Sequence, residues 1–197
     1  MRIQALMAGA AMAIVASAAA ASANAAELVT NGSFETGALS GWTHTGNLGQ
    51  SSVVPSSLNG GSFAYRNGAV GSDGIISQTV ATVAGQPYDY SFWLSNYRSG
   101  INDFTASLGG VVLQSFINSP AFAYTLFTGS VVATSSNATL SFAFRQDPSA
   151  WEINDISLAG GAGGVPEPAS WALMLTGFLG AGGAIRANRR RQAALAA

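Results

Sequence analysis

Apolar and polar residues alternate through the middle of the chain. In residues 88–95 (YDYSFWLS) the even positions are apolar and the odd positions are polar, except for Trp93. Residues 140–145 (LSFAFR) repeat the pattern, with Leu140, Phe142 and Phe144 on one side. A period of two is typical of a β-strand with one buried face. The alternation therefore predicts sheet structure, with Trp93 on the face opposite to the core residues of its strand.

Further strand-like pieces lie at 74–80, 104–116, 122–133 and 151–158, and residues 27–29 (ELV) form another near the start. Glycine, asparagine, serine and proline separate these pieces, as at residues 59–61 (NGG). Helical periodicity and internal repeats are both missing from this part of the sequence. Many short strands joined by such turns predict an all-β fold, an antiparallel β-sandwich or jelly roll, over residues 26–159.

The first 25 residues have the character of a signal peptide. Arg2 supplies a positive start, residues 3–21 are apolar and alanine-rich, and residues 23–25 (ANA) match the small-residue pattern before a cleavage site. We therefore predict export, with cleavage after Ala25. The alternative is a helix that stays in the membrane, but alanine is only weakly apolar and a strand-like segment follows at once.

The C-terminal region predicts a linker and then a membrane anchor. Residues 160–164 (GGAGG) are typical of a flexible tether, and no lysine or strand-to-helix context favours a phosphate-binding loop. Residues 169–185 carry no charge and would extend about 25 Å as a helix, slightly less than the roughly 30 Å hydrocarbon core. Four arginines follow and are expected to stay on the cytoplasmic side: Arg186, Arg189, Arg190 and Arg191.

We predict a C-terminal transmembrane helix that leaves residues 26–164 outside the cytoplasm, with residues 192–197 as a short tail. The alternative is a buried helix of the globular domain. Four glycines lie inside the stretch, at positions 177, 180, 182 and 183, and they disfavour a water-soluble helix.

The same region contains Pro166, Glu167 and Pro168, followed by Trp171 and Ala172. With the apolar segment and the arginines, this order resembles the PEP-CTERM sorting signal of Gram-negative bacteria, over residues 165–191. The resemblance implies that an exosortase recognises the chain, removes its transient anchor in the inner membrane and leaves it released or attached at the surface. In this sequence residues 187–188 interrupt the basic cluster, a departure that bears on the efficiency of processing.

Three stretches of the predicted sandwich carry a second resemblance. Residues 31–35 (NGSFE) with Gly41 and Trp42 open the domain, residues 77–94 contain SQTV, GQPY and FWL, and residues 153–158 (INDISL) close it. Together they resemble the galactose-binding-like jelly-roll family, which includes many carbohydrate-binding modules. The resemblance implies a sandwich whose first and last strands are adjacent.

In many members of that family a structural calcium lies near these two strands. The resemblance implies Glu35 and Asp155 as ligands, with backbone carbonyls near Asn31 or Ser33 completing an oxygen shell of the kind calcium prefers. The alternative is that Glu35 caps a turn and Asp155 bonds to the backbone.

Sugar recognition in such modules uses aromatic faces and polar groups that fix hydroxyls. From a wider set that also includes Trp42, Arg66 and Asn96, we predict ligand contacts by Trp93, Tyr97, Arg98 and Tyr65. Core packing remains the alternative for each aromatic residue.

Composition narrows the function further. The chain has 197 residues, which leaves room for one domain of ordinary size, and a formal net charge of −1 with 9% charged residues. This balance offers no basic surface for nucleic acid. The absence of cysteine excludes disulfides and thiolate chemistry.

Catalysis finds little support. The single histidine, His44, lies between threonines without a neighbouring carboxylate or nucleophile motif, so no catalytic triad is indicated. The sequence therefore predicts a non-enzymatic, exported surface or matrix protein that binds polysaccharide. The alternatives are a structural surface protein that binds proteins or itself, with no sugar site, and a small glycosidase, which requires two converging carboxylates.

Overall fold

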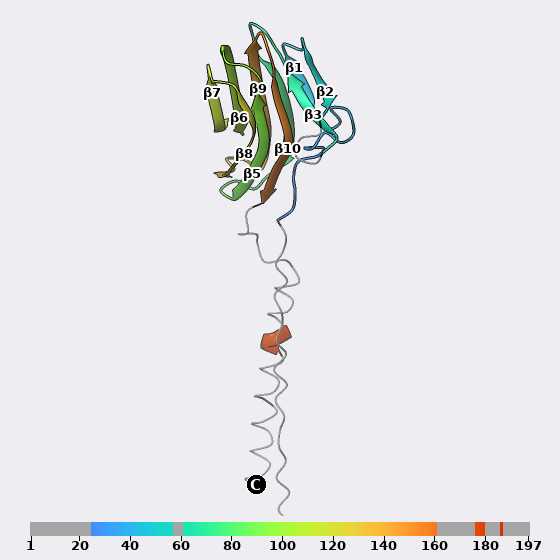
Figure 1. Cartoon of the computed structure of the whole chain (residues 1–197). Helices are drawn as coiled ribbons and strands as arrows, with labels where there is room; N and C mark the ends of the chain where they lie inside the picture. Colours follow the sequence, from blue (N-terminus) through green and yellow to red (C-terminus); the bar gives the residue numbers. More distant parts are fainter. Residues whose placement is uncertain (1–24, 57–60, 161–175, 180–185, 187–197) are drawn as a thin grey trace, which may run out of the picture.

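The computed structural model describes residues 25–56, 61–160, 176–179 and 186. Ten strands follow one another: β1 (Thr43–Gly46), β2 (Ser51–Pro55), β3 (Phe63–Asn67), β4 (Gly74–Ala81), β5 (Pro87–Asn96), β6 (Ile101–Leu108), β7 (Val111–Ile117), β8 (Phe122–Val132), β9 (Asn137–Asp147) and β10 (Trp151–Gly160). They form two antiparallel five-stranded sheets, in the orders β1-β4-β9-β6-β7 and β2-β3-β10-β5-β8. The two sheets pack face to face (Figure 1). The predicted all-β sandwich is confirmed.

The core lies between the sheets and is rich in aromatic rings. Phe92 and Trp151 come from one sheet, and Phe104, Phe142 and Phe144 come from the other; all five are fully buried. Phe104 is at the centre of this group, with its ring centroid 5.3 Å from Phe144 and 5.6 Å from Trp151. The alternation read from residues 88–95 and 140–145 therefore does place the apolar positions inside.

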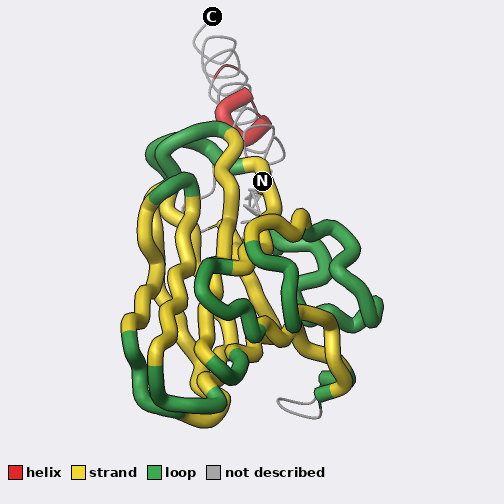
Figure 2. Tube along the Cα trace, turned by 90° about the horizontal axis from the view of Figure 1, so that it is seen from above, coloured by secondary structure: helices red, strands yellow, loops and turns green. Residues whose placement is uncertain are grey.

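The two ends of the sandwich domain lie side by side. Glu27 forms a bridge with Ala159, and the backbone N–H of Leu28 donates to the carbonyl oxygen of Leu158 at 2.9 Å. This confirms the adjacency of the first and last segments, although residues 27–29 make a single bridge where a strand was predicted. Strands run between loops at the two ends of the sandwich (Figure 2), and the chain enters and leaves at the same end.

Two details differ from the sequence prediction. The piece at 104–116 is two strands, β6 and β7, because Gly109 and Gly110 adopt positive φ angles and turn the chain. The short strands β1, β2 and β3 were not predicted, since they contain few alternating apolar residues.

Most of the two predicted terminal signals lies outside the described residues. This applies to the predicted signal peptide apart from Ala25, the predicted linker apart from Gly160, and residues 165–191 apart from a helical stretch at 176–179 and Arg186. In the described parts of the chain, no helix has the length and hydrophobicity that a membrane span requires.

Candidate functional site

The outer face of the sheet β2-β3-β10-β5-β8 carries a row of polar and aromatic side chains. The register places Glu152 of β10 between Arg66 of β3 and Ser95 of β5. One step along, Trp93 of β5 lies between Asn154 of β10 and Leu126 of β8. The residues that alternate with these, such as Leu94 and Ile153, point into the core.

Glu152 is the centre of this face. Its side chain is only 1% exposed, yet it receives hydrogen bonds from three other strands or loops. Arg66 donates to Oε2 from Nε at 2.9 Å and from Nη2 at 2.8 Å, and the Tyr97 hydroxyl donates to the same oxygen. The Tyr124 hydroxyl donates to Oε1 at 3.0 Å. A buried carboxylate is costly without such partners. The network joins β10 to β3, to β8 and to the residue that follows β5.

Tyr97 is the exposed aromatic residue of the network. Its side chain follows β5 directly and is 45% exposed, while its hydroxyl is held by Glu152. The guanidinium carbon of Arg66 lies 5.1 Å from the centre of the Tyr97 ring, within the range of a cation–π contact. Burial and the Glu152 carboxylate raise the pKa of Tyr97, so the hydroxyl stays a donor. The ring is therefore fixed at one end and open to solvent on its surface.

A cavity of about 280 Å³ adjoins Tyr97 and Arg66. Its other lining residues are Gln50, Gly68, Val70 and residues 148–150. It lies at the end of the sandwich opposite to the chain ends, since Trp151 begins β10 there and Gly160 ends it beside Ala26. Arg66 and Tyr97 therefore belong both to the Glu152 network and to the lining of this cavity.

The predicted ligand residues fall into three groups. Trp93 is half-buried on the outer face, as its position out of phase with the core predicted, and Tyr97 belongs to the Glu152 network. Arg98 is exposed in the loop after β5. Among the described residues, its side chain makes no contact with the Glu152 network. The prediction for Tyr65 is wrong, because its ring is fully buried and points into the core, between Phe34 and Phe144.

Sequence reasoning missed Glu152 and Tyr124, and it left Arg66 outside the final set. The sequence indicates Glu152 only as a carboxylate next to Trp151, at a position that alternates with the apolar residues of its strand. Its partners are 86, 55 and 28 residues away in sequence, so strand register alone brings them together.

The two predicted calcium ligands take different positions. Glu35 Oε1 accepts hydrogen bonds from the backbone N–H groups of Ser62 at 2.8 Å and Phe63 at 3.1 Å, as the alternative expected. Asp155 lines a separate cavity of about 350 Å³ with Glu27, Asn31 and residues 32–33. Among the described residues, no three His, Cys, Asp or Glu side chains are arranged to hold a metal ion. Calcium binding stays a prediction, and Asp155 lines this cavity together with residues 31–33.

His44 does not form a catalytic arrangement. Its Nε2 lies 3.2 Å from the Ser51 hydroxyl and 3.1 Å from the Tyr65 hydroxyl, and burial lowers its pKa. In the described part of the chain no carboxylate bonds to the ring. These contacts join β1 of one sheet to β2 and β3 of the other, which is a structural role.

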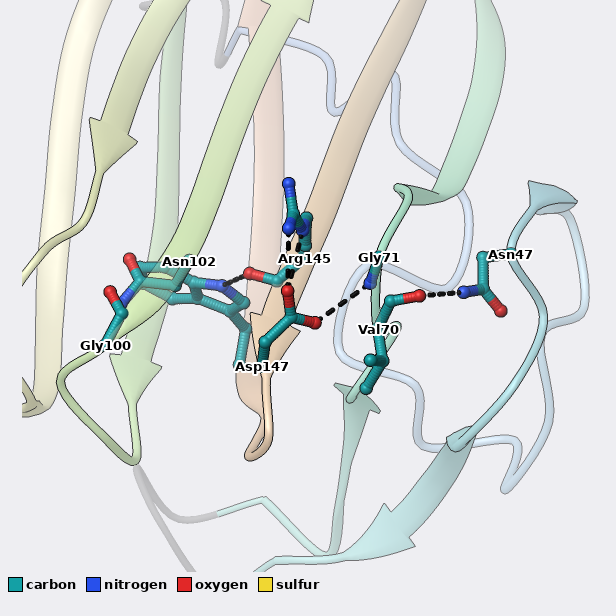
Figure 3. Close-up of polar contacts among 8 residues, drawn as sticks. Asn47, Val70, Gly71, Gly100, Asn102, Arg145 and Asp147 are labelled. Carbon is teal, nitrogen blue, oxygen red and sulfur yellow. Dashed lines mark hydrogen bonds and ion pairs between the residues drawn. The ribbon is translucent and has the colours of Figure 1, made fainter.

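A cluster of charged side chains lies on the outer face of the sheet β1-β4-β9-β6-β7. Arg145 donates to Asp147 Oδ2 from Nε at 3.0 Å and from Nη2 at 2.7 Å, and the Gly71 N–H donates to Oδ1 at 2.9 Å (Figure 3). Asp103 lies opposite Arg145 and bonds to Asp73. Burial, followed by the neighbouring Asp73 carboxylate, raises the pKa of Asp103 to about 6, against the opposing effect of Arg145.

This pair predicts a pH dependence of stability. Because the pKa of Asp103 rises from 3.8 to about 6 on folding, its stabilising contribution is complete below about pH 3.8 and is lost as the pH rises through about 6. We expect Asp103→Asn to gain stability relative to the wild type between about pH 4 and pH 7, measured by urea unfolding at each pH. His44, whose lowered pKa acts in the opposite direction, is present in both proteins and cancels. A difference that stays constant with pH would show that Asp103 is not protonated in this way.

Comparisons with solved structures place the fold. TmCBM61, solved in complex with β-1,4-galactotriose, matches with a TM-score of 0.53 and 18% identity, over 68% of this chain and 99% of that one. The xylan-binding domain CBM22-1 of Paenibacillus barcinonensis Xyn10C matches with a TM-score of 0.50 and 16% identity, over 69% and 95% of the chains. The K3 adhesin domain of Lys-gingipain from Porphyromonas gingivalis has a TM-score of 0.50 and 12% identity, over 70% and 100%.

The chain shares its jelly-roll fold with carbohydrate-binding modules. At these identities the likeness concerns the fold and not the ligand. No protein-family model matches the chain, and no curated protein matches its sequence.

Proposed function

We propose that the chain is a non-enzymatic, exported protein that binds polysaccharide on the outer face of the sheet β2-β3-β10-β5-β8. The observation that carries the proposal is the exposed Tyr97 ring, whose hydroxyl is held by the buried Glu152 and whose face lies beside Arg66. A ring fixed in this way loses little entropy when a ligand packs on it.

The chemistry of this face suits a sugar chain. The Tyr97 and Trp93 rings offer apolar surface to the C–H face of a pyranose, and the Arg66 guanidinium offers donors to hydroxyl oxygens. The neighbouring cavity adds polar groups from Gln50 and Ser149. Concave sites with aromatic walls and a few fixed polar groups are typical of small-ligand recognition. The shared fold supports the proposal, because TmCBM61, which has a similar fold, was solved with β-1,4-galactotriose bound.

The test is polysaccharide binding by the full chain, measured by a glycan array and by affinity electrophoresis against soluble polysaccharides. We expect Tyr97→Ala and Trp93→Ala each to weaken binding by about tenfold or more, since each removes most of an aromatic contact surface. Val83→Ala is the matched control, because Val83 is also exposed but lies in the turn between β4 and β5. Binding that survives both aromatic substitutions would overturn the proposed site. A folded protein that binds no glycan would favour the alternative, a structural surface protein without a sugar site.

The location of the protein is the second part of the proposal. We infer from residues 165–191 that an exosortase processes the chain and that the mature form works at the cell surface or in the extracellular matrix. This part rests on the sequence, and the intact mass of the native protein decides it: the mature form is expected to lack the segment from Trp171 to Arg191.

A further inference from the structure

Strand β8 is a long sheet edge with an open side. It forms the end of the sheet order β2-β3-β10-β5-β8 and has 11 residues, Phe122–Val132, with no charged residue and no proline. An edge strand directs half of its backbone N–H and C=O groups away from its only neighbour. Apart from the ladder with β5, residues 25–56 and 61–160 make one hydrogen bond to the β8 backbone. The Thr125 hydroxyl of β8 itself donates it to the Ala123 carbonyl oxygen.

The other three sheet edges are protected. Strands β1 and β2 have only four and five residues, and β2 ends at Pro55. Strand β7 is bulged, and the Tyr90 hydroxyl from the opposite sheet donates to its Leu113 carbonyl at 3.0 Å. Short edges, proline, bulges and covering groups are the usual means of preventing edge-to-edge pairing. Strand β8 has a bulge near its start, where Phe122–Thr125 face Leu94–Asn96 of β5, but from Leu126 to Val132 its register is regular and it has none of these features.

The chemistry of β8 fits a second copy of the same strand. Leu126 is 45% exposed and Val132 is 54% exposed, and no charge on the strand repels an identical neighbour. An antiparallel pair of identical strands is self-complementary, because a two-fold axis relates the two copies.

We propose that two copies of this chain pair antiparallel through β8, joining their five-stranded sheets into one continuous sheet. In such a pair the two-fold axis is perpendicular to the sheet, so both outer faces lie on the same side. Tyr124 of β8 bonds to Glu152, so the candidate site extends to this edge. The pairing therefore places two such sites on one surface, where they can engage one polysaccharide chain together. This last consequence rests on the proposed function, whereas the pairing itself does not.

The first experiment measures the mass of the full chain by sedimentation equilibrium without any sugar present. We expect a reversible dimer and a dissociation constant that is about tenfold or more higher for Thr128→Lys, because two lysines would face each other near the paired edge. Thr79→Lys is the matched control, since Thr79 is also exposed but lies on β4 in the other sheet, where it pairs with Thr139 of β9. A monomeric wild type, or a Thr128→Lys chain that dimerises as well as the control, overturns the proposal. A Thr128→Lys chain that dimerises as well as the control would indicate association through another part of the chain, such as the apolar segment 169–185.

The second experiment uses the absence of cysteine from the chain. Single cysteines are introduced at Leu126, Thr128 and Ser130, which share the outer side of β8, and the chains are oxidised singly and as pairwise mixtures. A two-fold axis at one of these residues opposes it to itself, and an axis between two of them opposes the two different positions. At least one chain or mixture is therefore expected to form a disulfide-linked dimer, because directly opposed positions of an antiparallel pair bring Cβ atoms close enough for the bond. A cysteine at Val83 serves as the control for random collision. If no chain or mixture exceeds that control, β8 is not the interface. Since no sugar is used, this result is independent of the polysaccharide test.

Discussion

Replacing Gly32 with alanine is expected to unfold most of the protein. A Cβ atom at this position would lie 1.9 Å from the carbonyl oxygen of Ile156 and 3.0 Å from its carbonyl carbon. Both are backbone atoms of β10, so no side-chain rotation can relieve the overlap. The same strand holds the segment in place, because the Ile156 N–H donates to the Gly32 carbonyl oxygen at 3.0 Å. We expect a loss of more than about 4 kcal/mol, comparable with the whole stability of a small domain.

The matched control is Gly160→Ala. Gly160 also lies beside the N-terminal segment, but a Cβ there would meet only the Tyr88 ring, at an ordinary contact distance of 3.8 Å. Its expected effect is within about 0.5 kcal/mol. Urea unfolding followed by tryptophan fluorescence measures both variants. Equal midpoints for the two would mean that β10 and the segment before Phe34 are less tightly packed than the structure indicates.

The fold was predictable where strands are long and one face is buried. Phe142 and Phe144 show this best, since their spacing alone placed them inside the sandwich. Short edge strands gave no such signal: β1 (THTG) has no apolar residue and owes its existence to pairing with β4. The break between β6 and β7 was missed because apolar residues continue on both sides of Gly109 and Gly110.

The site was predictable only in part, because alternation gives the phase of a strand but not its neighbours. Trp93 was placed on the outer face because it interrupts a clear pattern. Tyr65 was misplaced because β3 (FAYRN) has apolar residues at both phases, and Ala64 is buried as well. Glu152 was missed because its role depends on three hydrogen-bond partners, which come from β3, from β8 and from the residue after β5. Register across four strands is a property of the whole sheet, and a single sequence does not contain it locally.

Glu152→Ala is expected to weaken both stability and polysaccharide binding. Without the carboxylate, the largely buried Tyr124 hydroxyl loses its acceptor, while the Arg66 side chain, which is 40% exposed, can turn toward water. Since each unpaired buried donor costs about 1–3 kcal/mol, we expect a loss of about 3 kcal/mol. The Tyr97 ring is also released, and a mobile ring has to be ordered again when a ligand binds. Urea unfolding and affinity electrophoresis measure the two effects separately.

Two further variants separate charge from shape. Asp89→Ala removes a carboxylate from the same outer face, where Asp89 is exposed, and it is expected to change neither property. Glu152→Gln keeps the size of the side chain and an oxygen acceptor for one tyrosine but loses the ion pair with Arg66. We expect it to retain more stability than alanine, because fewer donors are left without a partner. If Glu152→Ala bound polysaccharide as tightly as the wild type while being clearly destabilised, the network would support the fold alone, and the sugar surface would have to lie elsewhere.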